Sequence, residues 1–580
     1  MKKYTAKPLC LAIGLALAGN VSAATVDFSG SNFYMKFLDG NQRGAPNGSI
    51  DTASGGDQGQ FTELNLIFKA KISPQVEAGG RIQSRSSAAY WTEFGGFGQE
   101  NSVGNNEVNH QKFMKLRGAY VELTPGYNWL NLARIGTSDW GMFDPFTVGK
   151  VRYIDRDNYN GFYFKGSVAP TSWEVARISL PSYLQFNWGQ GPICCSTDST
   201  QYNEAVYIAQ MKYPMRAANL AVSYQSFIDH TLSNPTPPPT YTSVNKKGIY
   251  KNAVGAFKAS GSPTDAIDLR GAYYRSTSNP SGGSIGESWG NAPRDNISDS
   301  AIKLDMDWAT PVSGLAFNFQ YFDIGAGYYS VAAARRESDV LLTEGSESAW
   351  YNWGNTLWSG GAATNYTQSA SNNRLTDNAF MDFDESPAES VVGWNGITAL
   401  AKYDANNTPM SLEYTRVDYD NNWQNYAATK PLANLYAANQ DRATDILAFK
   451  LNHIFSVMGG LDTNLKIKRV NDENNVSATT TADDRSVLDN GFSVSAGNQL
   501  HNHLYGTLSY GRYIRDIQVG SVEYNNSKSI YGVRLAYNLP GFEFGMLTQW
   551  IKGHGNPTEA VGGNTKIQQY RMKAFAQVNF

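Results

Sequence analysis

Apolar and polar side chains alternate one by one in short stretches that recur along the whole chain. Ile302, Leu304 and Trp308 fall on one face of an extended segment, whereas Lys303 and Asp305 fall on the other. The same alternation recurs at residues 62–72, 267–274, 315–321, 461–468 and 531–539. A period of two is typical of β-strands with one apolar and one polar face. The sequence therefore predicts an all-β protein.

The connections between the predicted strands alternate between short turns and long polar loops. Ten short turns are expected near residues 73–74, 124–126, 169–170, 214, 262–263, 310–311, 406–409, 458–460, 498–501 and 539–541. The segments between them run to about 10 to 60 residues and are rich in Asn, Ser, Gly and Asp. Transmembrane barrels show this asymmetry, and a β-sandwich has no reason for it. We therefore expect a transmembrane antiparallel up-and-down β-barrel of about 22 strands, within a range of 18 to 24.

Residues 1–23 have the organisation of a secretory signal peptide. Three lysines lie in the first seven residues, an apolar stretch runs from 9 to 19, and small residues precede a cleavage site after Ala23. The apolar stretch is about half of the ~20 residues that a membrane-spanning helix needs, so an uncleaved anchor is disfavoured. We expect residues 24–580 to form a single barrel.

The C-terminal residues also alternate, and the chain ends on an aromatic side chain. One face of this last predicted strand carries Tyr570, Met572, Val578 and Phe580. The last strand must pair with the first to close a barrel and remove its edges. The arrangement resembles the C-terminal assembly signal of Gram-negative outer-membrane β-barrel proteins. This resemblance implies a location in the cell outer membrane, contact with outer-membrane lipid and insertion by the barrel-assembly machinery.

The composition supports a barrel over a soluble enzyme. Charged residues make up 17% of the chain against about 25% in average globular proteins, while aromatic residues reach 13%. The mean hydropathy of −0.41 is far from that of a helical membrane protein. The net charge of −3 argues against a nucleic-acid partner. Length alone would suggest about four domains, but a single barrel accounts for it.

The predicted barrel has no visible plug, because the chain becomes strand-like at Thr25. A wide, empty barrel would leak, so its loops should fold inward. In this respect the chain resembles the porin family, in which the third outer loop dips into the lumen. Counting hairpins places the third loop at about 137–158. The candidates for a pore constriction in this loop are Asp139, Trp140, Phe143, Asp144, Phe146, Arg152, Asp155, Arg156 and Asp157.

Two interpretations of these loop residues remain open. Opposite charges across a narrow lumen would orient polar solutes, and aromatic faces would hold the apolar faces of sugars. The same charged residues could instead form ion pairs that fix the loop. For the opposite wall, the candidates on polar strand faces are Arg81, Arg85, Lys115, Arg117 and Arg270. The face on which Arg117 lies is ambiguous.

The longest predicted loop, at about 325–388, carries an aromatic cluster. Its members are Trp350, Tyr351, Trp353 and Trp358. The cluster could be a platform on which sugars stack, or it could form the loop's own small core.

Catalytic and cofactor motifs are scarce. The six histidines are scattered, there is no Gly-x-Ser-x-Gly motif, and no Cys-x-x-Cys-His motif would attach haem. We expect neither an enzyme nor a cofactor. Acidic stretches at 382–385 and 418–421 could bind Ca²⁺ but lack EF-hand spacing. Cys194 and Cys195 are adjacent, so they form either a vicinal disulfide or two loop thiols.

The sequence thus favours an outer-membrane porin through which small hydrophilic solutes diffuse passively. The alternatives are a channel specific for sugars or oligosaccharides, and a barrel sheath around an electron-transfer partner. The porin resemblance also allows a homo-oligomer.

Overall fold

The computed structural model describes most of the predicted strands and part of the connections between them. The described residues are 25–43, 59–87, 112–138, 140, 143–148, 160–179, 204–229, 249–281, 297–325, 327–328, 330, 393–405, 408–420, 440–476, 484–555 and 565–580. Within these ranges, no helix has both the length and the apolar character needed to cross a membrane.

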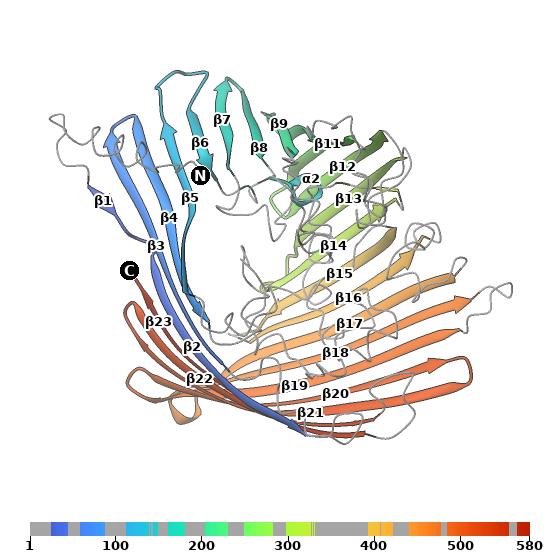
Figure 1. Cartoon of the computed structure of the whole chain (residues 1–580). Helices are drawn as coiled ribbons and strands as arrows, with labels where there is room; N and C mark the ends of the chain where they lie inside the picture. The colour runs from blue at the N-terminus through green and yellow to red at the C-terminus, as the bar shows by residue number, and fades with distance from the viewer. Residues whose placement is uncertain are drawn as a thin grey trace, which may run out of the picture.

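Long antiparallel strands make up almost all of the described chain (Figure 1). The first half contains β2 (Asn32–Arg43), β3 (Gly59–Ser73), β4 (Val76–Ser87), β5 (Lys112–Leu123), β6 (Leu132–Thr137), β7 (Asn160–Val168), β8 (Thr171–Ser179), β9 (Glu204–Pro214), β10 (Asn219–Asp229), β11 (Ile249–Thr264) and β12 (Ile267–Ser281). The second half contains β13 (Ile297–Ala309), β14 (Leu315–Ile324), β15 (Trp394–Asp404), β16 (Pro409–Tyr419), β17 (Gln440–Phe455), β18 (Leu461–Val476), β19 (Arg485–His501), β20 (Leu504–Val519), β21 (Val522–Leu539), β22 (Phe542–Gly555) and β23 (Thr565–Asn579).

These strands close into one barrel. Each strand pairs with its sequence neighbours, and β23 pairs with β2 from Asn32↔Asn579 to Arg43↔Gln568. At the seam the Phe580 amide donates a hydrogen bond to the Ser31 carbonyl at 2.9 Å. In the described chain, β2 to β23 therefore form a closed antiparallel barrel of 22 strands, which confirms the predicted fold.

The first barrel strand begins later than the sequence suggested. The alternation predicted a strand from about residue 25, but the short β1 (Val26–Asp27) pairs with β3 and stays outside the closed ring. The barrel strand begins at Asn32, after a turn at Gly30, whose φ is +86°. This left-handed backbone interrupts the extended chain, because it suits glycine and few other residues.

The two faces of the barrel wall differ in chemistry. On β13 the apolar side chains expected on one face are exposed on the outside, with Leu304 at 50% and Trp308 at 37%. On β20 the outward Leu508 is 65% exposed. Charged and polar groups such as Lys303 and Asp305 occupy the opposite, inner face. An apolar outer surface around a polar interior is the arrangement that a bilayer requires of a barrel.

Short connections gather at one end of the barrel, as predicted. At the other end, however, β20 and β21 are joined only by Gly520 and Ser521. The sequence suggested a longer polar loop in this region. Instead the polar residues extend both strands, which pair without interruption to Val519↔Val522.

Candidate functional site

The described part of the connection between β6 and β7, residues 138, 140 and 143–148, lies against the inner wall of the barrel. This connection is the third at the long-loop end, and it contains the short α2 (Pro145–Val148). This turn contacts β10 and β11 and lies beside β11 and β12 in Figure 1. The loop expected at 137–158 is therefore in the predicted place, and the part around α2 lies on the inner wall.

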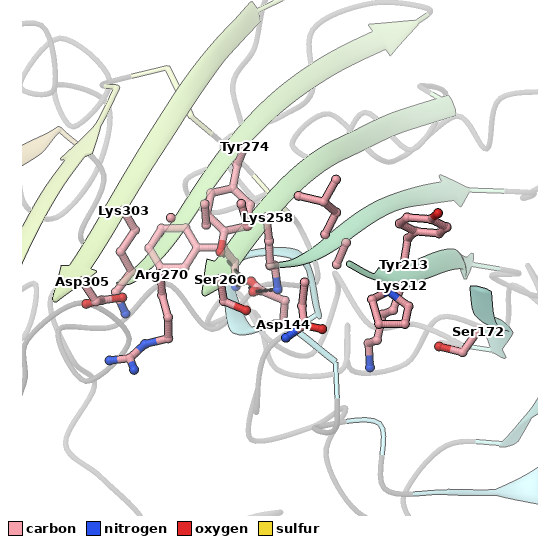
Figure 2. Close-up of a pocket in the computed structure, with 18 of the residues that line it drawn as sticks. Asp144, Ser172, Lys212, Tyr213, Lys258, Ser260, Arg270, Tyr274, Lys303 and Asp305 are labelled. Atoms are coloured by element: carbon pink, nitrogen blue, oxygen red, sulfur yellow. Dashed lines mark hydrogen bonds and ion pairs between the residues drawn. The ribbon is translucent and has the colours of Figure 1, made fainter. Parts of the chain in front are cut away.

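Asp144 fastens this segment to the wall. Its carboxylate forms an ion pair with Lys258 of β11 and accepts a hydrogen bond from the Tyr274 hydroxyl of β12 at 3.0 Å (Figure 2). Its other oxygen accepts the backbone N–H of Phe146 at 2.8 Å. The Asp144 side chain is only 10% exposed, so its three interactions are largely shielded from water.

Aromatic packing completes the attachment. The Phe146 ring stacks on Tyr274 with centroids 5.0 Å apart, and it lies 6.1 Å from Tyr328. Tyr328 follows β14, and its hydroxyl donates a 2.8 Å hydrogen bond to the Phe146 carbonyl. Ser330 donates to the Thr147 carbonyl at 3.0 Å. The start of the connection after β14 therefore holds the third connection against the wall.

Trp140 anchors the first part of the same segment and is fully buried. Gly161 on β7 leaves the space for its ring, since a Cβ there would lie 2.8 Å from the indole and 2.2 Å from the Arg177 carbonyl oxygen. Phe143 packs edge-on against Tyr163 with centroids 6.4 Å apart. These aromatic residues therefore pack against the wall.

A cavity of about 600 Å³ opens next to the Asp144 attachment (Figure 2). Its walls mix both signs of charge, including the residues Lys212, Lys258, Arg270, Lys303, Asp144 and Asp305. Several of these groups are neutralised locally: Arg270 pairs with Asp307 at 2.6 Å and Lys212 with Glu174 at 3.7 Å. The cavity wall therefore combines four basic and two acidic side chains with apolar residues such as Phe146 and Leu220.

A second inner cavity of about 740 Å³ has a more basic wall. Lys402 on β15, Lys450 on β17 and Lys466 on β18 line it, whereas Asp404 is the one acidic residue in its described lining. The three lysines belong to one cross-strand row, because Lys402 and Lys450 both pair with Ser411 and Lys450 pairs with Lys466. Like charges directly opposite on neighbouring strands are destabilising. The sequence does not predict this row, because alternation places Lys466 on a polar face but cannot align it with Lys450.

The arginines expected on the wall opposite the third loop are distributed differently. Arg81 on β4 donates two hydrogen bonds to the Asn65 side chain, at 2.8 and 3.1 Å. Arg270 lies in the same cavity as Asp144, so it stands beside the loop and not across from it. That part of the expectation is wrong, because the loop is seated on the wall that carries Arg270.

For two other predicted arginines, Arg85 and Arg117, the structure describes only the strand pairing of the backbone. Arg85 on β4 pairs with Glu63 and Phe113. Arg117 sits at a β-bulge, where the register passes from Arg81↔Gly118 to Ile82↔Leu116. A bulge adds one residue to one strand, which explains why alternation gave no clear face for Arg117.

Several predicted residues lie outside the described residues. From the third loop these are Asp139, Arg152, Asp155, Arg156 and Asp157. From the longest loop they are Trp350, Tyr351, Trp353 and Trp358, and Cys194 and Cys195 join them.

The C-terminal residues Tyr570, Met572, Val578 and Phe580 are described and lie on β23 or directly after it. Phe580 closes the barrel seam and is 62% exposed. The acidic stretch at 418–421 begins at the end of β16, where Asp418 accepts from the Arg416 guanidinium at 2.9 Å. Among the described residues, no group of three or more His, Cys, Asp or Glu is placed to hold a metal.

Comparison with solved structures gives matches at very low sequence identity and with TM-scores below 0.5. No family model and no curated protein matches the chain. The siderophore receptor PirA from Pseudomonas aeruginosa matches 94% of this chain and 80% of its own, with 6% identity and a TM-score of 0.41. OccAB2 from Acinetobacter baumannii matches 95% and 98%, with 9% identity and a TM-score of 0.36. OccK10 from Pseudomonas aeruginosa matches 82% and 99%, with 10% identity and a TM-score of 0.35. Such values assign neither a family nor a substrate.

Proposed function

We propose that this protein is an outer-membrane channel through which small hydrophilic solutes diffuse passively. The observation that carries the proposal is the attachment of the third connection to the inner wall of a closed barrel through Asp144, Lys258 and Tyr274. An inward loop narrows a wide barrel into a selective passage. The long-loop end then faces outward, and the short turns face the periplasm.

The physical basis of transport follows from the two faces of the wall. Outward apolar side chains such as Leu304 and Leu508 hold the barrel in lipid. Charged and hydroxyl groups of the interior replace water around a passing solute, so the solute does not meet hydrocarbon. The cavity beside Asp144 and the lysine row on β15, β17 and β18 offer charged side chains to a solute in this interior.

Purified protein in planar lipid bilayers tests the proposal directly. We expect stepwise conductance, together with swelling of protein-loaded liposomes in small sugars or amino acids at a rate that falls with solute size. A correctly folded barrel that gives neither conductance steps nor swelling would refute the proposal. If the liposomes swell with only one class of solute, the protein is a substrate-specific channel and not a general diffusion channel.

A further inference from the structure

The outward face of β20–β23 carries an aromatic tier, which lies near the middle of β20 and β21 and closer to the long-loop end of β22 and β23. Tyr510, Tyr531, Trp550 and Tyr570 are directly paired across these four strands. The ring centroids of Tyr510 and Tyr531 are 5.2 Å apart, and those of Trp550 and Tyr570 are 5.9 Å apart. Aromatic rings of this kind mark the level at which hydrocarbon meets lipid headgroups.

A tier of hydrogen-bond donors lies one step beyond the aromatic tier, toward the long-loop end. Its members are Arg512, Ser529, Lys552 and Gln568, which pair in that order across the same strands. Each is two residues along its strand from the neighbouring aromatic, so both tiers share the outward face. All four side chains can donate hydrogen bonds, and none of the four is acidic.

The donor tier contains two cations, Arg512 and Lys552, and a hydrogen bond orients the first of them. The Arg512 guanidinium donates to the Ser529 hydroxyl at 2.9 Å, which directs it along the tier, while Lys552 is exposed. Arg512 and Lys552 are two strands apart, about 10 Å, and long side chains can close that distance on one anionic headgroup.

Another outward arginine shows a different arrangement. Arg416 on β16 pairs with Asp418 at 2.9 Å and with Asp445 at 2.7 Å. Its charge is thus balanced by two carboxylates of the protein. Arg416 therefore serves as a matched control for Arg512 and Lys552: it is a cation on the same outer face, in an acidic setting that disfavours an anionic ligand.

We propose that the donor tier binds the phosphate of a lipid in the outer leaflet. The phosphate lies against Arg512 and Lys552 with Ser529 and Gln568 beside it, and the acyl chains run along the aromatic tier and the apolar wall below. Charge complementarity and continuity with the lipid-facing wall support this occupant. The inference rests on the outer-membrane location within the proposed function, but not on which solute passes through the barrel.

Lipid binding to the full-length mature barrel tests the site. Detergent-solubilised protein is titrated with bis-phosphorylated lipid A and, separately, with lipid A that lacks both phosphates, and bound lipid is counted by native mass spectrometry. We expect a clear preference for the phosphorylated form. The double variant Arg512→Gln/Lys552→Gln should bind the phosphorylated lipid roughly 30-fold more weakly. Each basic residue near an anionic surface strengthens binding by roughly fivefold, and the variant loses two of them. Arg416→Gln should bind it as the unaltered protein does.

Other outcomes separate this site from its alternatives. Equal binding of the two lipid forms, or an equal loss in Arg416→Gln, would overturn the proposal. Displacement of the lipid by millimolar inorganic phosphate would show a site for free anions and would also overturn it. Heat-modifiable migration in gels confirms that each variant is folded. A barrel that prefers the phosphorylated lipid but conducts nothing would refute the diffusion proposal and support this one.

Discussion

Tyr274 on β12 donates a 3.0 Å hydrogen bond to Asp144, a residue 130 positions earlier in the chain. The same carboxylate pairs with Lys258 on the neighbouring strand β11. Two adjacent strands thus hold one loop residue with a charge-assisted hydrogen bond and an ion pair. If the third connection narrows the passage, this carboxylate is the group that keeps it in place.

Asp144→Asn should release the segment from the wall without unfolding the barrel. Loss of one partner of a largely buried pair leaves the Lys258 charge uncompensated, at a cost of about 2–3 kcal/mol. Amide hydrogen exchange in residues 143–148 should therefore speed up roughly 30- to 150-fold while exchange in β11 stays slow. Asp265→Asn, at the exposed turn between β11 and β12, is the control. It should change the exchange rate neither in residues 143–148 nor in β11. Unchanged exchange in Asp144→Asn would show that the ion pair does not hold the segment.

Tyr328→Phe tests whether the connection after β14 supports the third connection. The variant removes the hydrogen bond to the Phe146 carbonyl and leaves that buried acceptor without this donor, which costs about 1–3 kcal/mol. The ring and its packing against Phe146 remain. We expect faster exchange in 143–148 and more open-channel current noise. If Tyr328→Phe and the unaltered protein show the same current noise and the same exchange, the Tyr328 hydrogen bond does not hold residues 143–148 in place.

Replacing Lys402, Lys450 and Lys466 by Gln should shift ion selectivity toward cations. The three lysines form one row on the inner wall, and their removal lowers the local positive potential felt by a passing ion. The reversal potential in a salt gradient measures the shift, which should shrink as salt rises because screening shortens the reach of the charges. The outward Arg416→Gln is the control. An unchanged reversal potential in the triple variant would mean that permeating ions do not come close to the three lysines.

Gly161→Ala should destabilise the contact that buries Trp140. The added Cβ would meet the Arg177 carbonyl at 2.2 Å and the indole at 2.8 Å, and such overpacking costs about 1–3 kcal/mol. Gly255→Ala on β11 is a matched control, because a Cβ there has no atom within 4 Å. Urea unfolding followed by gel mobility compares the two. If Gly161→Ala and Gly255→Ala unfold at the same urea concentration, the absence of a side chain at Gly161 is not needed to accommodate the Trp140 ring.

Alternation predicted the barrel and most strand positions because each strand presents one face to an apolar surface and one to a polar interior. Ile302, Leu304 and Trp308 were assigned to one face and Lys303 and Asp305 to the other, and the structure shows the same division. Alternation does not predict the structure where the backbone departs from regular extension. The turn at Gly30 delays the first barrel strand, and the two-residue connection at Gly520 and Ser521 replaces an expected loop.

The sequence by itself determined the class of fold, the strand number and the place of the third connection, because local periodicity records these features residue by residue. The tertiary structure alone decided which wall that connection meets, namely the one carrying Lys258, Arg270 and Tyr274. It also decided the alignment of Lys402 with Lys450 and Lys466, and of Arg512 with Lys552. The contact of Asp144 with Lys258 and Tyr274 joins residues more than 110 positions apart in the chain, so no local pattern records it. The two cross-strand rows depend on the register between neighbouring strands, and alternation within a single strand does not give that register.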